Sequence, residues 1–335
     1  LPSGILVDNF GIGRTLVISH IVMALAAVFL SIATGHISAV WALFLMGIGY
    51  SMTNPASGRA VLIWFSPKQR GTAMGIKQVG VPLGGIIAAG SGALVEFFEW
   101  NSIMLAAGIF ILLNGFFCTY LISEDDGEKE TRMPNTKKIR RVIGMRQLHI
   151  NTILNAFINI GQINFFSFLT LFLREVTLVS QPMASAAMGL AQSTSAFGRV
   201  FWGVVCDRWF VNHRRILMAL LCGLGSFFLF CMIFVQPSLG GWFGFLLASL
   251  LGFTIASYAP VAQAITVEMV SPSLSGSALG YNLMGVFLGG MVGPPIFGAI
   301  IDLTGSFEAG WVATSLLCAL GTFILIKWFK EGMNA

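Results

Sequence analysis

The chain has 335 residues, of which 56% are hydrophobic and 10% are charged. A soluble domain of this length needs far more polar surface to cover its core, so the composition excludes a soluble globular protein. The net charge of +5 does not indicate nucleic acid binding, because the basic residues lie in short loops and form no face interleaved with aromatic residues. We therefore interpret the chain as an integral membrane protein.

Its apolar segments are long enough to cross a bilayer, which takes about 20 helical residues. Barrel strands would alternate apolar and polar residues, whereas these segments are continuously apolar, so we predict an all-α membrane protein. The ten predicted complete spans are residues 15–34, 39–64, 71–94, 102–122, 148–173, 185–206, 214–235, 241–268, 275–301 and 308–329.

A charged segment, SEDDGEKETRMPNTKKIRRVIGMRQ, separates the fourth span from the fifth. It covers residues 123–147 and contains few apolar residues, so we predict a partly disordered linker. The predicted domains are an N-terminal helical bundle over residues 1–122, this linker, and a C-terminal helical bundle over residues 148–335.

The lysines and arginines indicate the orientation in the membrane. Most of them lie in the linker and in the loops on the linker's side, whereas the opposite side carries Arg174 beside several acidic residues. Loops rich in lysine and arginine face the cytoplasm. We predict a cytoplasmic linker and a multi-pass protein of the plasma membrane, in a bacterium the inner membrane.

Residues on the two sides of the linker match at constant offsets. Asp8 matches Asp207 at an offset of 199. At an offset of 205, Pro55, Ser66, Pro67, Gly71, Gly75, Gly80, Gly84 and Gly85 match Pro260, Ser271, Pro272, Gly276, Gly280, Gly285, Gly289 and Gly290. Two copies in the same orientation form the parallel repeat found in some secondary transporters.

One loop contains the pattern Gly-x-x-x-Asp-Arg followed by a basic pair. Its residues are Gly203, Asp207, Arg208, Arg214 and Arg215. An incomplete copy at the start of the chain has Gly4, Asp8, Gly11 and Arg14, while Asn9 and Thr15 replace basic residues. This repeated loop resembles the signature loop of the major facilitator superfamily, and the resemblance extends over essentially the whole chain.

The resemblance implies a transporter of two helical bundles with twelve spans, acting as a monomer without a cofactor. The first signature loop follows the second span in that family. We therefore expect the chain, which begins at Leu1, to be a fragment that lacks the first span and most of the second.

The resemblance also implies a conformational latch. Asp8 would meet the start of the span near Ser275, and Asp207 the start of the span near Gly71. A carboxylate at a helix N-terminus contributes about 0.3–1 kcal/mol when exposed and up to ~2 kcal/mol when partly buried. The alternative is that these charges only end helices and set topology. The predicted latch residues are Asp8, Arg14, Gly203, Asp207, Arg208, Arg214 and Arg215.

Glycines recur at intervals of four within two spans. Small residues at this spacing let helix backbones approach closely in lipid. The predicted packing glycines are Gly71, Gly75, Gly80, Gly84, Gly276, Gly280, Gly285 and Gly289.

Several polar residues lie within the predicted spans. A charged side chain at mid-membrane costs about 2.5–3.5 kcal/mol on insertion scales, so such residues face a cavity or a partner. We predict a substrate cavity lined by Lys77, Gln78, Asn155, Asn159, Gln162, Gln192, Ser195, Arg199 and Asn282. We expect Arg59 instead to extend to water at the cytoplasmic end of its span. An alternative for Lys77 and Arg199 is an ion pair with an acid on the absent spans.

The cations in this cavity favour an anionic substrate, because arginine offers paired hydrogen bonds to carboxylates. We predict a secondary active transporter that moves a small organic anion by alternating access, with a coupling proton as a possible second partner. The alternatives are proton-coupled efflux of amphipathic compounds and, less favoured, a membrane sensor that transports nothing. Four scattered histidines and five cysteines without ligand spacing indicate neither an enzyme nor a metal or cofactor site.

Overall fold

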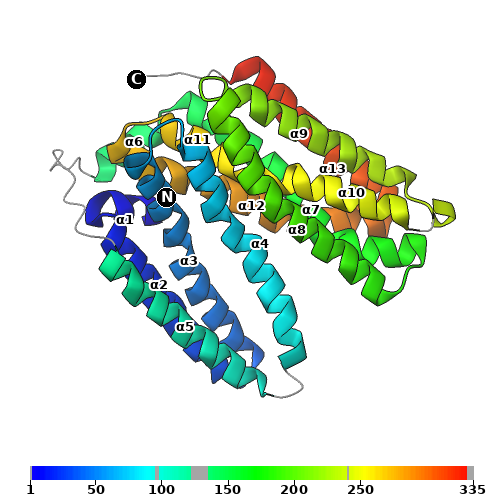
Figure 1. The fold of residues 1–335 in the computed structure, drawn as a ribbon, viewed down its shortest axis with the longest axis horizontal. Helices are drawn as coiled ribbons and strands as arrows, with labels where there is room; N and C mark the ends of the chain where they lie inside the picture. The colour runs from blue at the N-terminus through cyan, green and yellow to red at the C-terminus, as the bar shows by residue number, and fades with distance from the viewer. Residues whose placement is uncertain (1, 95–97, 122–134, 240, 330–335) are drawn as a thin grey trace. The chain divides into compact units, whose positions relative to one another are not determined.

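The computed structural model describes residues 2–94, 98–121, 135–239 and 241–329. Regular structure in this part of the chain is helical (Figure 1). The α-helices are α1 (Pro2–Phe10), α2 (Ile12–Ser31), α3 (His36–Trp64), α4 (Arg70–Leu94), α5 (Trp100–Leu121), α6 (Asn135–Ile143), α7 (Arg146–Thr177), α8 (Gln181–Trp209), α9 (Arg214–Cys231), α10 (Trp242–Phe253), α11 (Ala259–Glu268), α12 (Ser275–Thr304) and α13 (Phe307–Trp328). Four short 3₁₀ turns are η1 (Met232–Phe234), η2 (Pro237–Leu239), η3 (Ile255–Ser257) and η4 (Pro272–Leu274).

Every predicted span corresponds to a long helix, except that the eighth consists of α10, η3 and α11 in succession. Proline at 260, at the start of α11, lacks the N–H that an unbroken helix would use, which favours a break there. Eight segments in the described residues are long and apolar enough to cross a membrane. The long helices α4 and α8 are not among these eight, and both carry polar residues of the predicted cavity.

Part of the predicted linker is helical. Residues 135–143 form α6, and α7 begins at Arg146. Val142 and Lys138 on α6 are buried, so packing of one helix face stabilises this segment. The prediction of disorder for residues 123–134 lies outside the described residues.

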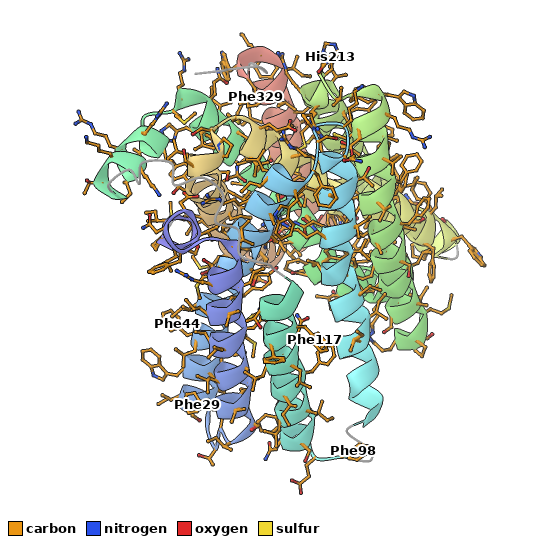
Figure 2. The ribbon with its side chains drawn as sticks, turned by 60° about the vertical axis from the view of Figure 1, so that its left-hand side comes forward. Phe29, Phe44, Phe98, Phe117, His213 and Phe329 are labelled. Atoms are coloured by element: carbon orange, nitrogen blue, oxygen red, sulfur yellow. The ribbon has the colours of Figure 1, made fainter. Side chains whose placement is uncertain are left out.

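The first of two compact units comprises Leu1–Trp64, Ile87–Gly144 and Val270–Tyr281. In it, α2 packs against both α3 and α5. Ser19 Oγ donates to the Gly49 carbonyl at 2.8 Å, and His20 Nε2 lies 2.9 Å from Asn114 Nδ2. Large apolar side chains on the outside of these helices, such as Phe44, are exposed (Figure 2), as expected for helices that face lipid.

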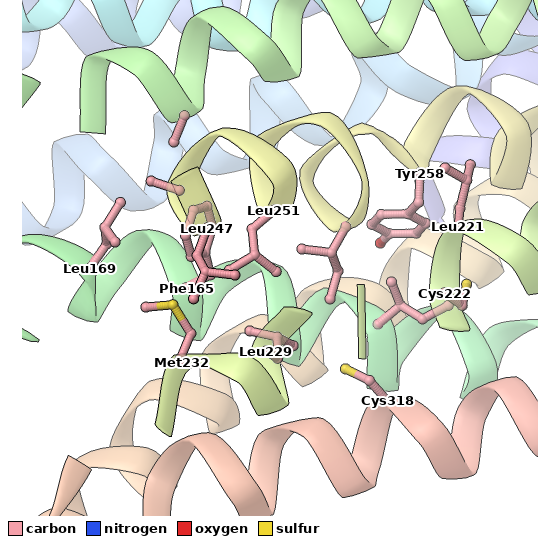
Figure 3. Close-up of a cluster of buried hydrophobic side chains, with 14 of the residues drawn as sticks. Phe165, Leu169, Leu221, Cys222, Leu229, Met232, Leu247, Leu251, Tyr258 and Cys318 are labelled. Carbon is pink, nitrogen blue, oxygen red and sulfur yellow. The ribbon is translucent and has the colours of Figure 1, made fainter. Parts of the chain in front are cut away.

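The second unit comprises Phe65–Ile86, Met145–Met269 and Asn282–Ala335. Its core is a cluster of buried apolar side chains from α7 to α13. Figure 3 shows Cys222 and Cys318 among the leucines and aromatic residues of this cluster, where they act as small apolar side chains. The unit also contains the first part of α4, just as the first unit contains the first part of α12. Each of these two helices thus starts among helices from the other half of the sequence.

Candidate functional site

Asp207, near the C-terminal end of α8, binds the first turn of α4. Its Oδ1 accepts from the Gly71 N–H at 2.8 Å, and its Oδ2 accepts from the Thr72 N–H at 2.6 Å. The first N–H groups of a helix have no partner inside the helix and carry the positive end of its dipole. One buried carboxylate therefore satisfies two of these donors, as the latch prediction requires for this copy.

Arg214, at the start of α9, connects this carboxylate to a second acid. Its side chain is only 1% exposed. Nη1 lies 3.5 Å from Asp207 Oδ1, Nε lies 2.9 Å from Glu268 Oε2, and Nη2 donates to the Pro67 carbonyl at 2.6 Å. Arg70 Nη1 lies 3.3 Å from Glu268 Oε1. The pairs and hydrogen bonds together offset part of the cost of removing these charges from water.

Asp8 on α1 makes the matching contact with the first turn of α12. Its Oδ1 accepts from the Gly276 N–H at 3.1 Å and its Oδ2 from the Ser277 N–H at 2.9 Å. The Ser277 hydroxyl donates to the same oxygen. Burial raises the pKa of the Asp8 carboxyl, while the Ser277 hydroxyl and the Arg59 charge act in the opposite direction. Both predicted contacts between an aspartate and a helix start are therefore present.

Arg59 on α3 does not extend to water as expected. Its Nη1 lies 3.1 Å from Asp8 Oδ1 and donates to the Val7 carbonyl at 3.2 Å. Charge-assisted hydrogen bonds are about twice as strong as neutral ones, so the carboxylate attracts this guanidinium away from solvent.

Glycines permit both aspartate contacts. A Cβ on Gly71 would lie 2.7 Å from the Gly203 carbonyl oxygen, and a Cβ on Gly75 would lie 2.4 Å from the Arg199 carbonyl oxygen. A Cβ on Gly4 would lie 2.1 Å from the Gly276 carbonyl oxygen. Any side chain at these positions would separate the two backbones, so the close approach depends on glycine.

The remaining predicted packing glycines divide between the two copies. Positions 285 and 289 on α12 pack against α7, where a Cβ would lie 2.3 Å from Thr152 Cγ2 and 2.7 Å from the Ala156 carbonyl oxygen. Among the described residues, nothing lies within 4 Å of such a Cβ on Gly80 or Gly84 of α4. This differs from the predicted packing, because glycine spacing shows where a close approach is possible but not whether a neighbour is present. The buried residue Gly280 belongs to the first unit.

Three arginines predicted for the latch make no ion pair with Asp8 or Asp207 in the described structure. Arg14 and Arg208 are exposed, and Arg215 Nη2 donates to the Ile326 carbonyl. Arg215 thus caps the end of α13 and Arg14 and Arg208 face outward. Among the predicted basic residues, Arg214 is the one that the structure brings to an aspartate.

The predicted cavity residues on α4 and α8 lie around the break between α10 and α11. Arg199 is 3% exposed. Its guanidinium donates to Ser195 Oγ at 3.3 Å, to the Gln78 carbonyl at 3.2 Å and Gln78 Oε1 at 3.1 Å, and to the Ala256 carbonyl at 3.0 Å. Gln162 Nε2 lies 3.5 Å from the same Ala256 oxygen. Residues of α4, α7, α8 and η3 therefore meet around the Arg199 guanidinium and the Ala256 carbonyl.

Two of these contributors were missed by sequence analysis. The Ala256 carbonyl is free to accept because the chain leaves α-helical geometry at η3, and no side-chain pattern reveals a backbone acceptor. Gln263 on α11 accepts from Lys77 Nζ at 2.8 Å. Gln263 is a polar residue within a predicted span, so the rule that selected Gln78 would also have selected it.

The other predicted polar residues form a second group along α7. Asn155 Nδ2 lies 3.4 Å from Asn282 Oδ1, and Asn282 Nδ2 lies 3.5 Å from Thr152 Oγ1. Asn159 Nδ2 donates to the Val286 carbonyl at 2.8 Å. Gln192 on α8 is half-buried, and its Nε2 would lie 3.8 Å from a Cβ on Gly85. The Oδ1 atom of Asn155 is buried without a hydrogen-bond partner in the described structure.

These groups offer hydrogen bonds and positive charge rather than redox or hydrolytic chemistry. The described residues contain no group of three or more His, Cys, Asp or Glu side chains that could hold a metal ion. Polar residues held within membrane-length helices, with two aspartates bound to helix starts, are the arrangement expected of a multi-pass membrane transporter of small solutes.

The chain belongs to the Major Facilitator Superfamily, whose family model matches residues 1–250 and 152–332. It is 23% identical over 346 residues to the hexuronate transporter of Bacillus subtilis, covering 98% of this chain and 81% of that one. It is 24% identical over 346 residues to the 3-(3-hydroxy-phenyl)propionate transporter of Escherichia coli, with the same coverage of 98% and 81%. The fold is similar to that of the Escherichia coli fucose:proton symporter, with a TM-score of 0.80 at 13% identity over 99% of this chain and 87% of that one.

Proposed function

We propose that the protein moves a small organic anion across the membrane by alternating access. The observation that carries this proposal is the environment of Lys77. Its ammonium donates to the neutral amide oxygen of Gln263, and the described residues place no carboxylate within 4.0 Å of it. A cation held in a membrane helix by an uncharged partner retains its attraction for an anion.

Arg199 adds to this attraction. Its hydrogen bonds to Ser195, Gln78 and Ala256 hold the guanidinium by neutral oxygens. These oxygens orient the group, and an arginine so oriented suits a carboxylate, which accepts two parallel hydrogen bonds.

The amide side chains along α7 support a substrate that also carries hydroxyl groups. The contacts between Asn155 and Asn282 and between Asn282 and Thr152 are long, and Asn155 Oδ1 has no partner in the described structure. Donors and acceptors that are weakly used can exchange for those of a ligand at low cost. The hexuronate and hydroxyphenylpropionate transporters are both named for carboxylates with hydroxyl groups, which is consistent with this substrate class.

The two aspartate contacts supply the conformational part of the proposal. Asp8 and Asp207 each stabilise one arrangement of helices through charge-assisted hydrogen bonds to a helix start. A transporter needs two arrangements of similar free energy. A contribution of about 1–2 kcal/mol from each of the two aspartate contacts is large enough to shift their populations. We further propose that the protein works as a monomer in the plasma membrane.

Binding and flux measurements in proteoliposomes test the substrate class. We expect hydroxylated carboxylates to bind, and both Lys77→Gln and Arg199→Gln to weaken that binding about tenfold or more, because each removes a charged partner. Lys68→Gln changes an exposed lysine outside the site and serves as the matched control.

Equal anion affinity in Lys77→Gln, Arg199→Gln and the control would reject the anion site. Anion uptake that rises with an imposed inward proton gradient would support symport. Proton-driven export of amphipathic cations would favour the efflux function instead, and a complete lack of flux would favour a sensor.

A further inference from the structure

The short helix α6 is a structural element that the transport proposal does not use. It belongs to the first unit, and one of its faces is buried. Lys138 is 3% exposed and Val142 is fully buried. Lys138 Nζ donates to Asn9 Oδ1 of α1 at 2.9 Å, next to the Asp8 contact. α6 is therefore held in place and is not a free charged tail.

The opposite face of α6 is positively charged. Lys137, Arg140 and Arg141 are all exposed. Residues at i, i+3 and i+4 of a helix lie on the same side, so these three cations point in one direction. Ile143 lies beside them and is 48% exposed. A helix that combines exposed cations with an exposed apolar side chain is typical of segments at a membrane surface.

The connection to α7 sets the position of this face. Gly144 and Met145 alone separate α6 from α7, which is 32 residues long. A helix of that length spans about 48 Å, which exceeds the hydrocarbon core of about 30 Å, so its ends lie at the level of the headgroups. Two connecting residues reach at most about 7 Å, so the chain connection by itself keeps α6 near the depth of the lipid headgroups.

We propose that the exposed face of α6, formed by Lys137, Arg140 and Arg141, binds the phosphate groups of anionic phospholipids in the adjacent leaflet. The charge of these groups is complementary, and the arginines match the geometry of phosphate oxygens. Because the other face of α6 is anchored to α1 through Lys138, bound lipid also stabilises the region around Asp8.

Lipid binding to the purified protein tests this proposal. Native mass spectrometry in neutral detergent measures the affinities of phosphatidylglycerol and phosphatidylcholine. We expect phosphatidylglycerol to bind the wild type more tightly, and the triple variant Lys137→Gln, Arg140→Gln, Arg141→Gln to lose about tenfold or more of that affinity. The charge-conserving variant Lys137→Arg, Arg140→Lys, Arg141→Lys retains most of it.

A second triple variant controls for net charge. Lys68→Gln, Arg174→Gln and Lys327→Gln remove three exposed charges outside α6 and leave phosphatidylglycerol affinity close to that of the wild type. An equal loss in both triple variants would overturn the proposal, as would an unchanged affinity in the α6 variant. Full displacement of the lipid by millimolar inorganic phosphate would also overturn it, since that result assigns the face to a soluble anion. If the triple variant fails to fold, Arg140→Gln and Arg141→Gln alone are each expected to reduce affinity.

Discussion

The sites around Asp8 and Asp207 are two copies of one device, and they differ in where the balancing cation comes from. Both carboxylates accept from two backbone N–H groups at a helix start. Asp207 is paired with Arg214 on α9, whereas Asp8 is paired with Arg59 on α3. The residue that matches Arg214 in the first copy is Thr15, whose hydroxyl donates to the Gly11 carbonyl.

This comparison separates a geometric requirement from an electrostatic one. The backbone contact depends on the position of the aspartate and on glycines that let the helices approach, so both copies share it. The positive charge acts over several ångströms and can come from any neighbouring helix. A copy without an arginine at this position can therefore still hold its carboxylate in place.

The largest expected effect comes from removing the two arginines in turn. Arg214 is almost fully buried and contacts both Asp207 and Glu268, while the Arg59 side chain is 18% exposed and pairs with one acid. We expect Arg214→Ala to lower the free energy of unfolding by about 3–5 kcal/mol, because it leaves two carboxylates without their main partner. Arg59→Ala should cost about 1–2 kcal/mol. Denaturation in detergent micelles measures both, and equal losses would show that the two sites do not differ in this way.

A smaller effect is expected from the matching glycines of α12 and α4. Gly289 packs against the backbone of α7, whereas no atom of the described residues lies within 4 Å of a Cβ built on its counterpart Gly84. Gly289→Val should therefore destabilise the protein by about 1–3 kcal/mol through overpacking, and Gly84→Val by less than about 0.5 kcal/mol. Thermal unfolding of the two variants gives the difference, and a similar loss at both positions would mean that Gly84 also has a close neighbour.

The smallest expected effect concerns the pH response of Asp8. Burial raises the pKa of this carboxyl, and Arg59 opposes the rise. Acidification therefore protonates Asp8 at a higher pH than an ordinary aspartate, and Arg59→Gln should move that pH further upward. Infrared difference spectra report the protonated carboxyl, with Asp8→Asn to identify its band. A downward shift in Arg59→Gln would contradict the pairing.

The sequence anticipated the helices and the aspartate contacts well, for a physical reason. Crossing a bilayer requires about 20 continuous apolar residues, so the spans are visible in composition alone. The repeat aligned Asp8 with Asp207 and the two helix starts with each other, so one contact implied the other. The sequence could not show that Arg59 pairs with Asp8, because a guanidinium near a span end can reach either water or a carboxylate.

The continuously apolar segments were thus enough to determine a helical membrane protein, and the resemblance of the repeated loop to a known family added the paired aspartates at helix starts. Only the tertiary structure decided which glycines meet a neighbour, that Lys77 pairs with Gln263, and that the Ala256 carbonyl accepts from Arg199. These contacts join residues distant in sequence, and a backbone acceptor at a helix break has no side-chain signal. Their geometry depends on how packed helices are placed, which local sequence patterns do not encode.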